Sequence, residues 1–475
     1  MKTIAVLPFR DMSAAQDQAY FGEGIAEELL NALVKLEGVK VASRTSAFSL
    51  ADEDLDIPAM AARLGVDHIL EGSIRTSGRQ VRVTAQLIEV SEDVHLWSDT
   101  YDGTLDDIFR IQDEITAEIS EAMKVQLGGM ALRPASEELT DNAEAYQRYL
   151  QGRHLWRQRN NASLREAIAL FEEAVEIDPQ FDRAWSNLAI AHFNLPDYDH
   201  DAVFWDSIGQ GLAAAERALA INPQSTEALI IQANYLEMKC QFAESARRYE
   251  AAIALAPNDP TAHHWYALLL MFSGRTMAAL EQIRIAHELD PLISAVISVE
   301  SRLQNLVNDH RKSAELALRA ASLGLHGGSP VPAGLAYLLD GDFERGRQRV
   351  LEGEPDATPQ VIESRRLFVA ALGERSRLPA FEANAGTANP KEPFASIDVA
   401  GMLAMLGSEY LFTFYAEVEC PHVSADVWLD EFRLLRGTPE FFELMSRAGI
   451  VEFWREFGWP DECASLDQSL AECPE

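Results

Sequence analysis

Four cysteines and two adjacent histidines are the residues whose type and spacing could carry chemistry. Cys240, Cys420, Cys463 and Cys473 form no CxxC pair and show no metal-ligand spacing. Cys240 falls within a helical pattern and is predicted to be a small core residue. Cys463 and Cys473 could form a disulfide under oxidising conditions, and spacing alone leaves that question open.

His263 and His264 would point about 100° apart on a helix, so they are not expected to share a metal ion. The sequence contains no Walker loop, HExxH pair or GxSxG elbow, and Gly22-Glu-Gly24 lacks the third glycine of a dinucleotide fingerprint. We therefore predict a non-enzyme with no catalytic residue, metal or cofactor. An enzyme with an unrecognised site is the alternative.

The charge balance restricts the classes of partner. The chain of 475 residues has 75 acidic and 40 basic residues, a net charge of −35. Such a charge argues against nucleic acid and anionic membrane surfaces, which both require clustered cations. No apolar run is long enough to span a bilayer, so no membrane insertion is expected. The opening MKTIAVLPFRDM indicates a strand and a loop rather than a signal peptide, which predicts a cytoplasmic protein.

A repeat in the middle of the chain indicates the elements that must position a binding surface. Pro223, Pro257 and Pro291 each end a helical segment and are 34 residues apart, the period of tetratricopeptide repeats. Pro179 lies 44 residues before Pro223, which fits one repeat plus an insertion at 196–205. Small residues occur in phase where paired helices must approach closely: Ala167, Ala174, Ala233, Ser245, Ala252, Ala267, Ala279 and Ala286.

Stacked hairpins of this kind present a groove lined by their first helices. We predict that this groove binds a protein or peptide, with a pure scaffold as the alternative. The repeat phase places the following residues on it: Ser186, Ile190, Phe193, Ile230, Asn234, Met238, His264, Leu268 and Met271. These side chains are mostly apolar with few cations, which favours a helix or an apolar segment over an acidic tail. They could instead pack against the C-terminal region.

The first 128 residues alternate between strand and helix patterns, which predicts an α/β domain with a mixed sheet. An apolar stripe runs along a helix from Phe21 to Leu36, and Glu23, Glu27 and Glu28 are expected to face water. A β-hairpin is predicted around a Ser77-Gly78 turn, with Ile74 opposite Val81 and Leu70 opposite Ala85. Further expected elements are strands at 39–42 and 95–101 and helices at 57–64 and 105–127.

The C-terminal region shows shorter and less regular helical stretches, interpreted as degenerate hairpins. Its aromatic end, which includes Phe441, Phe453 and Trp454, is expected to cap the repeats, with a ligand-binding aromatic cage as the alternative. The predicted organisation is an α/β domain at 1–128, a linker at 129–140, repeats at 141–325 and degenerate repeats with a cap at 326–475.

Residues 3–125 resemble the TolB-like, or FlgO-like, amino-terminal domain family. The resemblance rests on IAVLPFRDMS, YFGEGIAEELLNAL, LGVDHILEGSIRTSGRQVRVTAQLIE and HLWSDTYDGTLDDIFRIQDEI. The repeats and the closing FWREFGWPDEC are similar to those that follow this domain in bacterial regulators. In that family the arrangement accompanies a CadC-like winged-helix domain or a class III adenylate cyclase domain.

The resemblance implies a regulatory scaffold in bacterial signalling. The alternative is a detached sensor of a cyclase or winged-helix system, in which case a periplasmic location is the alternative to the cytoplasm. The family supplies no catalytic residues to transfer, and the sequence identifies neither the partner nor the oligomeric state.

Overall fold

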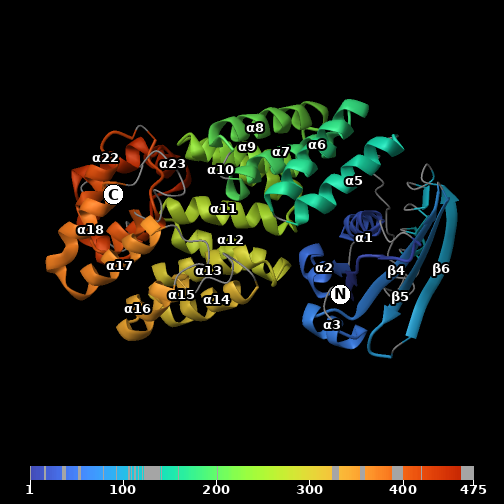
Figure 1. The fold of residues 1–475 in the computed structure, drawn as a ribbon, viewed down its shortest axis with the longest axis horizontal. Helices are drawn as coiled ribbons and strands as arrows, with labels where there is room; N and C mark the ends of the chain where they lie inside the picture. Colours follow the sequence, from blue (N-terminus) through green and yellow to red (C-terminus); the bar gives the residue numbers. More distant parts are fainter. Residues whose placement is uncertain are drawn as a thin grey trace. The chain divides into compact units, whose positions relative to one another are not determined.

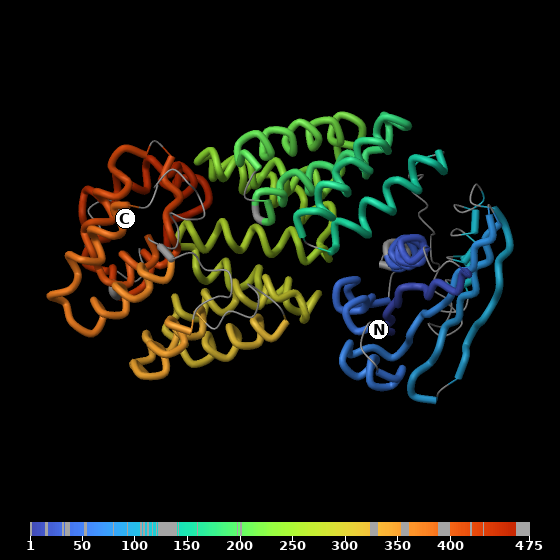
Figure 2. The backbone as a smooth tube through the Cα atoms, viewed as in Figure 1, coloured from blue at the N-terminus to red at the C-terminus, as the bar shows by residue number. Residues whose placement is uncertain are grey.

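The computed structural model describes residues 2–461 with the following exceptions: 15–17, 35–38, 52–54, 79, 93, 105–106, 108–109, 112–113, 116, 120, 122–139, 141, 159, 200–201, 324–330, 353–358, 388–399 and 419. The chain divides into two compact units, Met1–Ile231 and Gln232–Glu475. Figure 1 labels the helices and strands, and Figure 2 follows the backbone in the same view. The predicted linker lies almost wholly outside the described residues, as do Cys463 and Cys473.

A mixed six-stranded sheet opens the first unit. Its strands are β1 (Lys2–Val6), β2 (Arg10–Asp11), β3 (Val39–Val41), β4 (His68–Ser77), β5 (Gln80–Glu89) and β6 (Val94–Thr104). The order is β3-β1-β4-β5-β6, with β2 beside β4. Strands β1, β2, β3 and β4 pair in parallel, and β4, β5 and β6 pair antiparallel. The predicted α/β class with a hairpin is confirmed.

The hairpin has the predicted faces but a different register. Ser77 pairs with Gln80 and Ile74 with Val83, so each partner lies two residues beyond the predicted one. Because Ser77 pairs with Gln80, Gly78 is the first residue after the strand instead of the second residue of the turn, and it adopts a left-handed φ of 60°. Because side chains alternate with a period of two, the shift keeps Ile74, Val81 and Val83 on the buried face.

Helices cover both faces of the parallel part of the sheet. Helix α1 (Ala19–Val34) packs over Ile4, Val6 and Leu70, while α2 (Arg44–Ala51) and α3 (Ile57–Leu64) lie over Ala5 and Ile69. In α3, Asp56 accepts a hydrogen bond from the Ala59 amide at the start, and Gly65 ends the helix. From the predicted helix at 105–127, Ile111, Ile115 and Ile119 are fully buried, whereas Ile108 and Met123 lie outside the described residues.

Helical hairpins follow the sheet within the first unit. They are formed by α5 (Ala143–Arg157), α6 (Asn161–Ile177), α7 (Asp182–Tyr198) and α8 (Phe204–Ile221). Helix α6 starts with a capping box of Asn160 and Ser163 and ends two residues before Pro179. One hydrophobic cluster runs from the sheet through α1 into these hairpins, from Ile4 to Phe171 and Ala215. The sheet and the first hairpins therefore share a core.

The second unit continues the hairpin pattern. Its helices are α9 (Thr226–Met238, which begins in the first unit), α10 (Phe242–Leu255), α11 (Pro260–Phe272), α12 (Thr276–Leu289), α13 (Ser294–Leu306), α14 (His310–Ser322), α15 (Val331–Leu339) and α16 (Phe343–Glu352). Every small residue predicted at a helix contact is fully buried, and so are the bulky Tyr249 and Ile283. Ser245 also donates its hydroxyl to the Ala233 carbonyl at 2.8 Å. Proline phase and small residues thus identified these hairpins correctly.

Aromatic residues of the remaining helices pack against the end of α11 and the loop that follows it. These helices are α17 (Pro359–Gly373), η3 (Arg375–Arg377), α18 (Leu378–Ala385), α20 (Tyr410–Phe414), η4 (Ala425–Trp428), η5 (Asp430–Phe432), α21 (Arg433–Arg436), α22 (Pro439–Arg447) and α23 (Ile450–Phe457). The indole of Trp428 donates to the Phe272 carbonyl at 3.0 Å and that of Trp454 to the Ser273 carbonyl at 2.7 Å. Phe441, Phe453 and Trp454 are buried, so they pack as core residues.

A disulfide bond joins this region to the repeats. Cys240, directly after α9, is bonded to Cys420, with 5.8 Å between the two Cα atoms. The prediction of Cys240 as a small core residue is therefore wrong. Gly449 packs against the Cys240 carbonyl so closely that a side chain there would collide with it. No described helix is long and apolar enough to cross a membrane.

Candidate protein-binding surface

The predicted groove residues of α7 differ in accessibility. Ser186 is buried, and its hydroxyl lies 2.8 Å from that of Ser225. Phe193 lies against Gly211 of α8, where an added Cβ would be 3.3 Å from the ring. Its ring is therefore directed into its own hairpin. Ile190 is half-buried against the core of the first unit.

Helix α9 carries the next three groove residues. Ile230 is buried, and Asn234 is buried and accepts a hydrogen bond from the Tyr249 hydroxyl at 2.5 Å. Met238 is half-buried. Of this set, Met238 retains a flexible and partly accessible apolar side chain, a type suited to contacts with partners of varied shape.

Helix α11 carries the last three predicted groove residues, His264, Leu268 and Met271. Met271 is fully buried, whereas His264 and Leu268 are half-buried. Burial lowers the pKa of His264 to about 4, so the imidazole is neutral at pH 7. Its Nε2 atom is buried and has no hydrogen-bond partner among the described residues. Met238, His264 and Leu268 therefore keep accessible surface within the second unit, and a partner contact by the groove residues stays a prediction.

Glu237 of α9 is a partly buried acidic residue that the sequence reasoning missed. It is half-buried on α9, next to Met238, and burial raises the pKa of its carboxyl to about 8, although a hydrogen bond with Tyr249 opposes this shift. A single glutamate in a helical repeat carries no sequence signal that it will be buried. The carboxyl is protonated at neutral pH and can donate a hydrogen bond.

This raised pKa predicts a pH dependence of stability. In the unfolded chain Glu237 titrates near its usual 4.5, so its favourable contribution is complete below pH 4.5 and is lost as pH rises through 8. Between pH 6 and 9 we expect the free energy of unfolding of the second unit to fall by about 1–3 kcal/mol. Replacing Glu237 with Gln should remove this loss, because the amide does not titrate. Urea denaturation combined with hydrogen exchange of α9 and α10 at pH 5, 7 and 9 checks it.

The matched control for this prediction is Glu281→Gln on the exposed side of α12. It should keep the wild-type pH profile. A Glu237→Gln variant that loses stability with pH as steeply as the wild type would contradict the assignment.

The acidic residues of α1 do not face water, contrary to the prediction. Glu27 is 7% exposed and forms ion pairs with Arg153 and Arg157 of α5 and, at 3.3 Å, with Arg44. Glu23 pairs with His154 at 3.0 Å and with Arg157, and Glu28 pairs with Arg183 of α7 at 2.9 Å. The first hairpins therefore present Arg153, His154, Arg157 and Arg183 to α1, which lies beside α5 (Figure 1).

The pKa shifts in this contact follow from burial and charge. Burial, together with the nearby charge of Arg44, lowers the pKa of Arg157 to about 10. Although burial raises the pKa of Glu23, the hydrogen bond from His154 and the charge of Arg157 bring it below its usual value. The contact is thus a network of ion pairs centred on the buried Glu27 and Arg153.

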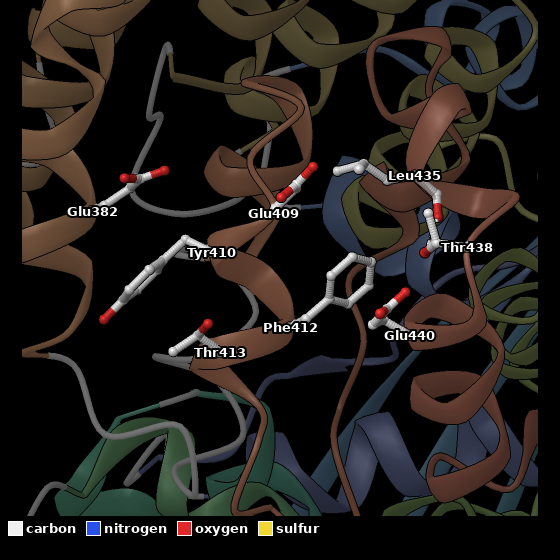
Figure 3. Close-up of a pocket in the computed structure, with 8 residues that line it drawn as sticks. All are labelled: Glu382, Glu409, Tyr410, Phe412, Thr413, Leu435, Thr438 and Glu440. Carbon is white, nitrogen blue, oxygen red and sulfur yellow. Dashed lines mark hydrogen bonds between the residues drawn. The ribbon is translucent and has the colours of Figure 1, made fainter.

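A pocket of about 420 Å³ lies in the C-terminal helices between α18, α20 and α22 (Figure 3). Its lining residues are Glu382, Glu409, Tyr410, Phe412, Thr413, Leu435, Thr438 and Glu440. Ser408 donates its hydroxyl to Glu382 at 2.6 Å. Across the described chain, no group of three or more His, Cys, Asp or Glu residues is placed to hold a metal ion. The pocket lining offers carboxylates, hydroxyl groups and aromatic rings.

Two comparisons concern the sequence. Residues 1–118 match the model of the family described as "HilA/YgeH-like transcriptional regulator, second domain". A protein of Rhizobium meliloti (strain 1021) named "Putative adenylate cyclase 3" is 36% identical over 220 residues, which is 46% of this chain and 37% of that protein. The chain therefore spans little more than a third of this relative's length. The TolB-like or FlgO-like assignment stays a prediction.

Solved structures with helical repeats are also similar to the chain. A thermophilic TPR protein of Thermus thermophilus is 15% identical with a TM-score of 0.34, covering 41% of this chain and 99% of its own. The type IV pilus biogenesis factor PilW is 15% identical with a TM-score of 0.37, and the match covers 47% of this chain and 98% of PilW. The hairpin fold itself is established by the buried small residues and helix bounds given above.

Proposed function

We propose that the chain is a non-catalytic interaction protein that binds a protein or peptide through the first helices of its second-unit hairpins. One observation carries this proposal. Along α9 and α11, the small residues at the contact between the two helices of a hairpin are fully buried. The side chains of Met238, His264 and Leu268 keep accessible surface. A partly accessible apolar patch fits a short apolar segment or the apolar face of an amphipathic helix.

Affinity purification of the tagged full chain from its native host, followed by mass spectrometry, identifies the partner. The double variant Met238→Ala/Leu268→Ala should then weaken binding at least 10-fold, because buried apolar anchors dominate interface energetics. Met277→Ala is the matched control, since Met277 is 59% exposed on the second helix α12. Isothermal titration with each variant, after a melting curve shows that it is folded, gives the affinities. Equal affinities for all three proteins would contradict the proposal.

A second candidate function is a signalling module that acts in trans on an adenylate cyclase or a winged-helix regulator. The matches to a HilA/YgeH-like domain and to a protein named as a cyclase favour it. A gene for such an effector beside this gene would support it. Adding the full chain to that effector should change its product formation or DNA binding severalfold, and no change would count against this candidate.

The proposed activity requires no cofactor and no nucleic acid. For location, the disulfide between Cys240 and Cys420 supports the periplasmic alternative over the cytoplasm, because such bonds persist in oxidising compartments. Thiol trapping in cells of the native host, with the two cysteines found oxidised or reduced, separates the two locations.

A further inference from the structure

We propose that the contact between α1 and the first hairpins is autoinhibitory, and that it covers a surface of α5 and α7 that receives an acidic helix of a partner. This inference rests on the proposed function in taking the groove of the repeats as the binding surface. It adds a second region of that groove, a partner chemistry and a regulatory step.

Charge complementarity defines the partner. Glu23, Glu27 and Glu28 lie on one side of α1 and pair with cations that all come from outside that helix. The cations on the hairpins are Arg153, His154, Arg157 and Arg183. A partner helix that binds here would therefore carry three carboxylates with the spacing of Glu23, Glu27 and Glu28. These are the first, fifth and sixth positions of a two-turn segment, and they lie on one side of a helix.

Shape restricts the partner further. Gly24 lies directly against Leu150 of α5, and a Cβ at this position would be 2.5 Å from a Leu150 methyl carbon. Tyr20 accepts a hydrogen bond from the Gln147 amide at 2.9 Å, one turn earlier on α1. The surface thus selects a helix with a small residue beside its first carboxylate and a hydrogen-bonding aromatic residue just before it.

Burial explains why exchange is favoured over simple opening. Arg153 is 9% exposed and also donates to the Tyr149 hydroxyl at 3.0 Å. If the α/β domain moved away without replacement, Arg153 and Arg157 would lose the Glu27 carboxylate that pairs with both of them, which is unfavourable. A partner helix with the same carboxylates restores the pairs. The α/β domain and the partner are therefore expected to compete for one surface.

A peptide-binding experiment on the full chain tests this competition. The probe is a fluorescent peptide of residues 18–34 in which the sheet-facing Phe21, Ile25, Leu29 and Leu33 are replaced by Gln. The control peptide also has Glu23, Glu27 and Glu28 replaced by Gln. The opened protein is Glu27→Arg/Glu28→Arg, and its matched control is Glu166→Arg/Glu172→Arg, which changes exposed acids on α6. A charge-swapped protein adds Arg157→Glu/Arg183→Glu to the opened one.

We expect the opened protein to bind the probe at least 10-fold tighter than the wild type and the control peptide not at all. The control variant should behave as the wild type, and the charge-swapped protein should not bind. Equal binding by the opened and wild-type proteins would overturn the proposal. So would hydrogen exchange showing that α5 to α8 unfold in the opened variant, since α1 would then be a permanent part of the fold. Because the probe reports only on α5 and α7, its failure leaves the test at Met238 and Leu268 intact.

Discussion

Replacing Glu27 with Ala is expected to lower the free energy of unfolding of the first unit by about 3–5 kcal/mol. Glu27 is 7% exposed and pairs with Arg153, Arg157 and Arg44. Its removal leaves the buried Arg153 without its carboxylate and the half-buried Arg157 with only Glu23, and a buried unpaired charge is among the costliest defects in a protein. Urea denaturation, with hydrogen exchange of α1 and α5 as the local measurement, checks this loss.

Two further variants control this experiment. Glu166→Ala on the exposed side of α6 should change the unfolding free energy by less than about 0.5 kcal/mol. The pair Glu27→Ala/Arg153→Met should recover part of the loss, because an apolar side chain replaces the unpaired guanidinium. A loss below about 1 kcal/mol for Glu27→Ala would mean that the network contributes little and that the apolar part of the contact holds α1.

Replacing both Cys240 and Cys420 with Ser is expected to destabilise the second unit by roughly 2–5 kcal/mol and to leave the first unit unchanged. The bond joins residues 180 apart in the sequence, so it excludes many conformations of the unfolded chain. The C-terminal helices should still dock, because Trp428 and Trp454 keep their hydrogen bonds to the loop after α11. The measurement is the urea midpoint of each unit, followed by hydrogen exchange.

Reductant provides the internal control for the disulfide. Dithiothreitol should destabilise the wild type as much as the double substitution does and should have no effect on the Cys240→Ser/Cys420→Ser variant. The variant Cys463→Ser/Cys473→Ser should retain the wild-type response. If thiol labelling finds Cys240 and Cys420 reduced in protein from an oxidising compartment, the assignment of the bond is wrong.

The sequence predicted the parts of the fold that depend on local patterns. Proline spacing and buried small residues such as Ala233 and Ala267 identified the hairpins, because a close helix crossing requires small side chains at fixed positions. Alternation identified the inward face of the hairpin strands. The register was missed because Ser77-Gly78 and Gly78-Arg79 are both acceptable turns, and both keep Ile74 and Val83 inside.

Features that depend on distant residues could not be predicted in this way. Glu27 and Arg153 are 126 residues apart, and each separately resembles a solvated charge on an amphipathic helix. Cys240 and Cys420 show no mutual spacing rule. Among the predicted groove residues, Ile190 and Met238 have accessible surface, but Met271 is fully buried, because repeat phase gives the side of a helix and not what packs against it.

The core that α1 shares with α5 also constrains how such a chain can be recombined by gene fusion. A breakpoint between the sheet and the first hairpin would leave Arg153 and Arg157 in one fusion product and Glu27 in the other, so that both lose their ion-pair partners. Viable mosaics are therefore expected to inherit the sheet together with α5 to α7 as one block, and new effectors are expected to be joined outside that block.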